Sequence, residues 1–138
     1  MNSVPVSASA NTYLAVHDGE YVLAGGRSGP APIDGAMYGL LPLLEREPAE
    51  VIAAIAALGG AAFPYSQLLE TALQSNSGYW QERAVPWLIA LNPAPEGSLA
   101  AAGHQALEMR RASQESRHAI RRWLRGKPPA GRDEQPTV

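Results

Sequence analysis

The stretch 48–74, PAEVIAAIAALGGAAFPYSQLLETALQ, decides the fold class of this 138-residue chain. Pro48 suits the first turn of a helix, the following residues are nearly all apolar, and a Gly-Gly pair then supplies a typical helix stop. We therefore expect a central, buried helix that ends near Leu58. Pro64 begins a second helix, which has one apolar and one polar face and ends near Gln74. Two helices joined by a short connection favour a mainly α fold with antiparallel neighbours.

Residues 12–24, TYLAVHDGEYVLA, predict a β-hairpin before these helices. Two runs rich in Tyr, Val and Leu flank Asp18-Gly19, a dipeptide that accepts the positive φ angles of a tight hairpin turn. An isolated two-stranded hairpin is only marginally stable, so we expect it to pack against the helices. The small and polar residues 1–11 show no apolar periodicity and are expected to form a flexible leader.

Three further helices are indicated by caps, apolar periodicity and stop signals. One spans about Gly35 to Arg46 and is interrupted by Pro42, which lacks an amide donor. Another spans Gly78 to about Leu91 and turns its two tryptophans inward. The last and longest is expected to run without a break from Ser98 to Arg125.

The predicted organisation is one domain, residues 12–126, between the flexible leader and a disordered tail, 127–138. Within this domain the hairpin, 12–24, precedes about five antiparallel helices in residues 34–126.

Segments 48–74 and 77–125 each resemble one helix pair of a HEAT-like repeat, in which an apolar helix packs beside an amphipathic one with proline kinks. The resemblance covers about half of the chain and implies an α-helical stack or bundle.

The composition excludes several classes of protein. The chain has no cysteine, which rules out disulfide frameworks, thiolate metal sites and cysteine nucleophiles. The longest apolar run, Val51 to Leu58, is far shorter than the roughly 20 residues of a membrane-spanning helix. The N-terminus lacks the basic start and apolar stretch of a signal peptide, so we expect a cytoplasmic protein without membrane contact. Because neither a G-x-S-x-G elbow nor a phosphate-binding loop is present, we expect no enzymatic activity and no cofactor.

Charge is distributed unevenly along the chain. Residues 1–82 hold two basic and eight acidic side chains, whereas residues 83–138 hold nine basic and five acidic ones. An acidic surface would steer a basic protein toward it, although exposed carboxylates are also common where no partner binds. The candidate acidic partner-binding residues are Asp18, Glu20, Asp34, Glu45, Glu47 and Glu50.

The last predicted helix carries an alternative binding face. Its arginine stripe consists of Arg110, Arg117, Arg121 and Arg125. Guanidinium groups bind the carboxylates of an acidic protein or the phosphates of a nucleic acid. The slightly acidic pI of about 5.9 and the scarcity of aromatic residues along the stripe count against nucleic acid. A second stripe on this helix, from His104 to Arg122, alternates in charge and is typical of a solvated surface.

Two smaller features complete the list of candidates. Glu115 and His118 have the E-x-x-H spacing of di-iron helical bundles, but the sequence offers no second E-x-x-H for the opposite ligands. A metal-dependent bundle enzyme is therefore the least supported alternative function. Tyr79 is a candidate interface aromatic, because its neighbour Trp80 is assigned to the core.

Together these features predict a protein-binding module that masks another protein. A small chain without cysteine or catalytic motifs and with strongly charged regions is similar in type to small bacterial toxin-immunity proteins. That resemblance implies that the partner is a toxin or effector. A nucleic-acid-binding regulator that uses the arginine-rich helix is the main alternative. The oligomeric state and any pairing of the hairpin edge with another chain are left open.

Overall fold

The computed structural model describes residues 2–26 and 29–126. The predicted disordered tail lies outside the described residues. The chain divides into two compact units, residues 1–71 and 72–138. The division falls within helix α2 (Tyr65–Leu73).

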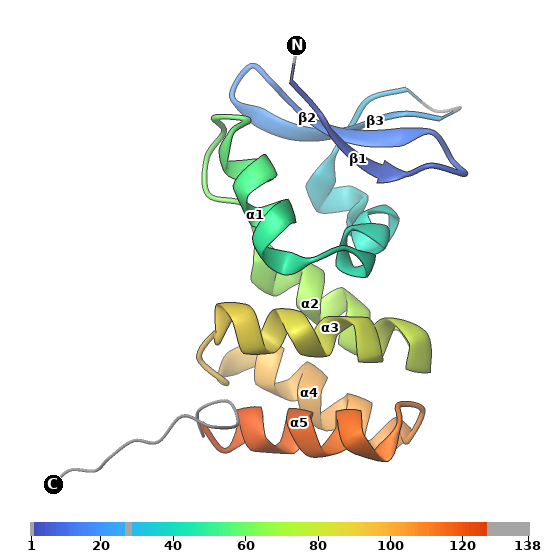
Figure 1. Cartoon of the computed structure of the whole chain (residues 1–138), viewed down its shortest axis with the longest axis vertical. Coiled ribbons are helices and arrows are strands. Elements are labelled where there is room, and N and C mark those ends of the chain that lie inside the picture. Colours follow the sequence, from blue (N-terminus) through green and yellow to red (C-terminus); the bar gives the residue numbers. More distant parts are fainter. Residues whose placement is uncertain (1, 27–28, 127–138) are drawn as a thin grey trace, which may run out of the picture. The chain divides into compact units, whose positions relative to one another are not determined.

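The first unit contains a four-stranded antiparallel sheet in the order β1-β2-β3-β4 (Figure 1). Its strands are β1 (Val4–Ser7), β2 (Thr12–His17), β3 (Glu20–Gly25) and β4 (Ala31–Pro32). The predicted hairpin is confirmed, and Asp18 and Gly19 hold its turn with φ angles of 54° and 81°. The mainly α prediction is thus correct only in part, because the fold is mixed α and β.

The predicted flexible leader is wrong for residues 4–7, which form strand β1. Val4 and Val6 are buried on the same side of this strand, whereas Pro5 between them is exposed. Val4 pairs with Leu14 of β2. This short alternating run therefore forms a strand because β2 supplies the backbone partner for it. Four residues are too few for such alternation to stand out in a polar sequence.

Both strands of the hairpin are interior strands of this sheet. The outer strands β1 and β4 each contain a proline, Pro5 and Pro32, which has no amide hydrogen to offer a further strand. The register of β1 also shifts between Pro5 and Ser7. The hairpin edges that the sequence left open are therefore occupied within the chain.

Two 3-10 segments and one helix cover one face of the sheet (Figure 1). They are η1 (Ile33–Gly35), η2 (Met37–Glu45) and α1 (Pro48–Ala56). The α-helix expected over 35–46 is wrong, because this region forms the tighter 3-10 turns. Pro42 cannot donate an α-helical hydrogen bond, and Gly39 approaches β3 so closely that a Cβ would lie 2.9 Å from Leu23 Cδ2.

Helix α1 has nearly the predicted bounds, but it is not buried all round. Only Pro48, Val51 and Ile55 are buried, and three of its alanines, Ala49, Ala53 and Ala56, are exposed. Alanine exposes little apolar surface, so a helix rich in alanine can lie on the outside of a unit at small cost.

An aromatic cluster fixes the connection between α1 and α2 to the hairpin. The Tyr21 hydroxyl donates a hydrogen bond to the Ala61 carbonyl oxygen at 2.6 Å. The Tyr21 ring meets Phe63 edge-on at 5.3 Å between centroids, and Phe63 meets Tyr65 at 4.8 Å. Burial raises the pKa of both the Tyr21 and the Tyr65 hydroxyls, and for Tyr65 the charge of Tyr21 adds to this effect.

These raised pKa values predict a loss of stability in alkali. The folded state holds the phenol protons more tightly than the unfolded chain, so the stabilisation is complete below the unfolded pKa of about 10 and is lost as pH rises through the folded values. We expect urea unfolding, followed by circular dichroism, to give a free energy of unfolding that falls above about pH 10.

Tyr21→Phe should be less stable than the parent at neutral pH, because the bond to Ala61 is lost, and should show a smaller alkaline fall. Tyr38→Phe, at an exposed side chain, is the matched control. An alkaline fall of equal size in Tyr21→Phe and in the parent would contradict the assignment.

The second unit is built from helices α3 (Gly78–Leu91), α4 (Gly97–Met109) and α5 (Gln114–Leu124). Helix α3 has the predicted bounds. Its N-cap Ser77 accepts a hydrogen bond from the Trp80 amide, and Asn92 ends it in the left-handed conformation. No helix among the described residues is long and apolar enough to cross a membrane.

The single long helix predicted over 98–125 is wrong, because the chain reverses between α4 and α5. Arg110 ends α4 with a left-handed φ of 54°, and Ser113 then caps α5 by accepting a hydrogen bond from the Ser116 amide at 3.1 Å. Helix α5 folds back along α4, where Gly103 comes so close to Trp123 that a Cβ would lie 3.0 Å from its ring.

The core of the second unit differs from the prediction at one turn of α3. Trp80, expected inside, is only half-buried, whereas the neighbouring Gln81 is fully buried. The Gln81 amide donates to the Leu73 carbonyl oxygen at 3.2 Å, which compensates the burial of its nitrogen. The other buried side chains of this unit include Ala84, Trp87, Leu88, Leu99, Ala102, Ala106, Ala112, Ile120 and Trp123.

Candidate protein-binding surfaces

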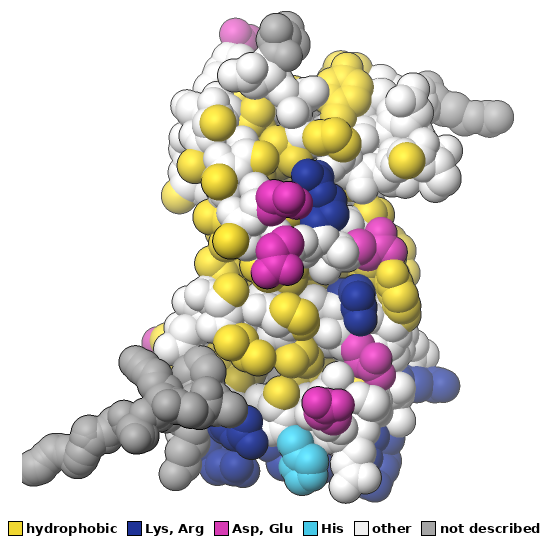
Figure 2. Space-filling model, viewed as in Figure 1, with side chains coloured by type: hydrophobic (Ala, Val, Ile, Leu, Met, Phe, Trp, Pro, Cys, Tyr) yellow, Lys and Arg dark blue, Asp and Glu magenta, His cyan; other side chains and the backbone are white. Residues whose placement is uncertain are grey.

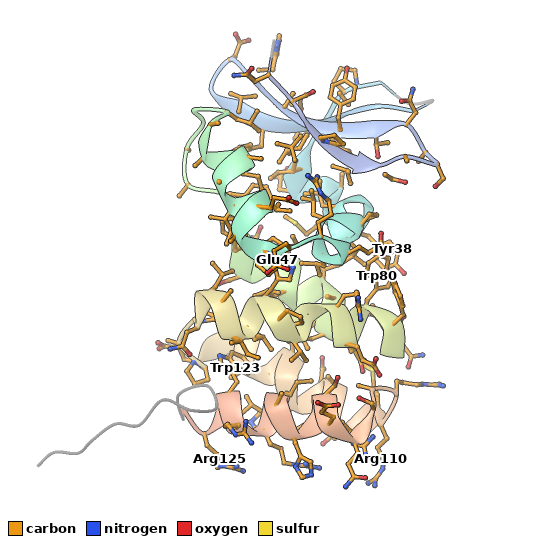
Figure 3. The ribbon with its side chains drawn as sticks, viewed as in Figure 1. Tyr38, Glu47, Trp80, Arg110, Trp123 and Arg125 are labelled. Carbon is orange, nitrogen blue, oxygen red and sulfur yellow. The ribbon has the colours of Figure 1, made fainter. Side chains whose placement is uncertain are left out.

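The six acidic candidates all belong to the first unit, and all are exposed. Asp18 and Glu20 lie at the turn of the hairpin, Asp34 lies in η1, and the remaining three flank the junction of η2 and α1. We call these three residues, Glu45, Glu47 and Glu50, the acidic junction. Glu47 precedes the first residue of α1 (Figure 3), where a carboxylate is favourable beside the positive end of the helix dipole.

The acidic candidates do not form one surface. The hairpin turn lies near the C-terminal end of α1, since Val16 and Tyr21 lie within about 3 Å of the Cβ position at Gly60. The acidic junction lies at the opposite end of this nine-residue helix, which is about 13 Å long. Arg46, between the carboxylates of the junction, donates to the Pro5 carbonyl oxygen at 3.0 Å and so ties β1 to this end of the unit.

The arginines of the second unit do gather on one surface. The reversal at Arg110 ends the predicted charge-alternating stripe, because His104 and Glu108 remain on α4. On α5 alone the two stripes merge, and we call the exposed residues of this helix from His118 onward, together with its C-cap, the basic face. The basic face consists of His118, Arg121, Arg122 and Arg125. Figure 2 shows basic side chains and a histidine gathered over α5, the lowest helix in Figure 1.

The remaining predicted arginines have different positions. Arg117 is only half-exposed and donates to the Ala112 carbonyl oxygen at 2.7 Å, so it fastens the start of α5. Arg110 lies before α5, at the end of the helix opposite to Arg125 (Figure 3). The predicted stripe therefore contributes two of its four arginines to the basic face, and Arg122 joins them.

A groove runs between α3 and α5 beside the basic face. It has a cavity volume of about 790 Å³ and is lined from α3 by Glu82, Arg83, Val85, Pro86 and Ile89 and from the α5 region by residues 113–116, 118, 119 and 122. Ile89 is 49% exposed there, one of the few large apolar side chains that the described residues leave so open to solvent. We call this feature the α3–α5 groove.

Charge changes along the α3–α5 groove. At one end, the Glu82 carboxylate accepts a hydrogen bond from the Ser113 amide at 2.7 Å and so joins α3 to the start of α5. Both helices run in the same direction from this point (Figure 1), so Arg122 lies toward the other end. The groove thus passes from a mixed-charge end, through an apolar middle, to the basic face.

The sequence contains a signal for this groove that the prediction did not use. Val85, Pro86 and Ile89 recur at helical spacing on a side of α3 different from the buried Ala84, Trp87 and Leu88. This second apolar stripe of α3 lies outside the core and predicts an exposed apolar surface.

Tyr79 lies on α3 outside this groove. Its ring is 52% exposed, packs edge-on against Trp80 at 4.9 Å, and has the Arg83 guanidinium 5.5 Å from its centre. These contacts hold Tyr79 in place as an exposed aromatic and leave its role in an interface untested.

Glu115 and His118 are both exposed and both line the α3–α5 groove. Within residues 2–26 and 29–126, no group of three or more His, Asp or Glu side chains could hold a metal ion. Among these described residues, the E-x-x-H spacing therefore lacks the additional protein ligands that a bundle metal site requires.

Comparison with protein-family models, with curated proteins and with solved structures gives no match for this chain.

Proposed function

We propose that this chain is a cytoplasmic protein-binding module that masks a partner protein. Its most concrete form is an immunity protein that neutralises a bacterial toxin or effector. The observation that supports protein binding best is the α3–α5 groove, with Ile89 half-exposed in its apolar middle.

An apolar groove with a charged rim suits a segment of another protein. Exposed apolar surface between two helices is covered favourably by the side chains of a partner helix or strand, at about 25 cal/mol for each Å² buried. Pro86 and Ile89 offer rigid, branched surface for such side chains, and the polar rim leaves the groove compatible with water when it is empty.

The α3–α5 groove supports the proposed protein binding better than the acidic candidates do. The acidic residues are separated by the length of α1, and exposed carboxylates at a helix N-terminus already have a structural explanation. The groove and the basic face, by contrast, are adjacent and come from the same two helices.

The test begins with capture of a partner from nuclease-treated lysate on the tagged full chain, followed by calorimetry with the purified partner. Ile89→Asp should weaken binding about 10-fold or more, because burial of an isoleucine contributes about 1.5 to 3 kcal/mol. Ala90→Asp is the matched control, since Ala90 is exposed on the same helix but does not line the groove. Equal affinity for the two variants would contradict the proposal.

The same experiment tests the acidic candidates. Charge reversal at Asp34 and the acidic junction should leave affinity within a few-fold of the parent if the groove is the binding site. A large loss of affinity in this charge-reversal variant, with the affinity of Ile89→Asp unchanged, would show that the partner binds the first unit instead. Masking itself requires that the partner's own activity disappears at one equivalent of the chain.

A nucleic-acid-binding regulator is the second candidate, because Arg121, Arg122 and Arg125 lie together at the C-terminal end of α5. It predicts that the captured species is nucleic acid from untreated lysate and that its affinity falls steeply with salt. The apolar groove beside the arginines has no role in that function.

A further inference from the structure

We propose that the occupant of the α3–α5 groove is an acidic amphipathic segment of a partner protein, with an apolar side chain on Ile89 and carboxylates on the basic face. The inference rests on the proposed function and adds the chemistry of the partner to it. Two independent features of the second unit carry it, the apolar middle of the groove and the charge at one end.

The apolar middle sets the first requirement. Val85, Pro86 and Ile89 from α3 face Ala119 from α5 across the groove. Ala119 is small, so α5 leaves room for a side chain from another molecule above it. An aliphatic or aromatic side chain that enters here covers Ile89, which is 49% exposed.

The basic face sets the second requirement. Arg121 and Arg122 are exposed on the last turn of α5, Arg125 is its exposed C-cap, and Arg122 itself lines the groove. Arginine binds a carboxylate through two parallel hydrogen bonds, so side chains of Asp or Glu next to the apolar anchor find matched partners. His118 lies among these residues, with Nδ1 3.4 Å from an Arg121 nitrogen, and adds a further polar group.

The other end of the groove sets the direction of the segment. There the Glu82 carboxylate is engaged by the Ser113 amide, and Arg83 and Glu115 offset each other in charge. The cationic excess therefore lies at the Arg122 end only. The segment should carry its carboxylates on one side of the apolar anchor rather than on both.

The phosphate backbone of a nucleic acid would contact only the basic part of this surface. Phosphates would occupy the arginines, but they carry no apolar group to cover Pro86 and Ile89. An acidic amphipathic segment satisfies both halves at once, and this decides between the two classes of partner.

The probe is a fluorescently labelled helical peptide with leucine along one face and glutamate elsewhere, titrated with the full chain at low salt. We expect binding that weakens about 10-fold or more in Ile89→Asp and in the double variant Arg121→Glu/Arg122→Glu. The matched control is Arg110→Glu/Arg111→Glu, which changes the net charge equally but lies outside the groove. This control should retain most of the affinity.

Three results would overturn the inference. They are tighter binding of a peptide with lysine in place of glutamate, displacement of the peptide by single-stranded DNA, and equal loss in the two double arginine variants. Its failure is distinguishable from that of the proposed function. Suppose that Ile89→Asp no longer binds the captured partner but Arg121→Glu/Arg122→Glu still does. The proposed function then stands, because the groove binds protein, and the inference of an acidic segment is wrong.

Discussion

Replacement of Trp87 by alanine is expected to lower the free energy of unfolding of the second unit by about 3 to 5 kcal/mol. Trp87 lies on α3, is only 1% exposed, and belongs to the largest fully buried side chains of the chain. Its removal leaves a cavity among close-packed neighbours, so the lost apolar burial and the cavity add. Urea unfolding followed by far-ultraviolet circular dichroism measures the loss without relying on tryptophan fluorescence.

Ile89→Ala is the control for Trp87→Ala, because it shortens an exposed side chain on the same helix. Its effect should stay near 0.5 kcal/mol, the usual range for surface substitutions. A loss of less than about 1.5 kcal/mol in Trp87→Ala would show that α3 does not pack on the core as described.

Gly78→Ala is expected to destabilise the second unit by about 1 to 3 kcal/mol through a steric clash. A Cβ at Gly78 would collide with the Arg111 carbonyl oxygen and lie 3.0 Å from its carbonyl carbon. Because these are backbone atoms, the connection between α4 and α5 has to move. That movement strains the Glu82–Ser113 hydrogen bond, so binding of the acidic peptide should weaken together with stability.

Gly35→Ala provides the matched control for this clash. A Cβ at Gly35 meets nothing within 4 Å, and its φ is not positive, so the same chemical change should be nearly neutral. Urea unfolding of both variants and anisotropy with the peptide probe supply the two readouts. Equal stability of Gly78→Ala and Gly35→Ala would contradict the close approach of α3 to residue 111.

Elements whose signals are local were predictable from the sequence. The hairpin follows from Asp18-Gly19, and the bounds of α3 follow from Ser77 at its start and Asn92 after its end. Strand β1 was not predictable in this way, because residues 4–7 are extended only through their pairing with β2. The 3-10 form of η2 likewise depends on the close contact of Gly39 with β3.

The candidate site could be predicted only as separate residues. Arg121 and Arg125 were predicted as members of the arginine stripe, but their grouping with His118 and Arg122 depends on where α5 begins. The apolar pattern of residues 99–124 continues through Arg110 and hides the reversal, since a left-handed arginine has no reliable sequence signal. The groove in turn exists only because α5 returns alongside α3.

The prolines at the two outer strands have a consequence for how copies of this chain behave at high concentration. A sheet whose last strands offer a full row of amides and carbonyls is a template for open-ended β-stacking between molecules. Pro5 and Pro32 each delete a donor from those rows, and the shifted register of β1 bends one of them out of line. Any strand that added to either edge of this sheet would therefore lack at least one backbone hydrogen bond, which disfavours growth of a fibril from the sheet.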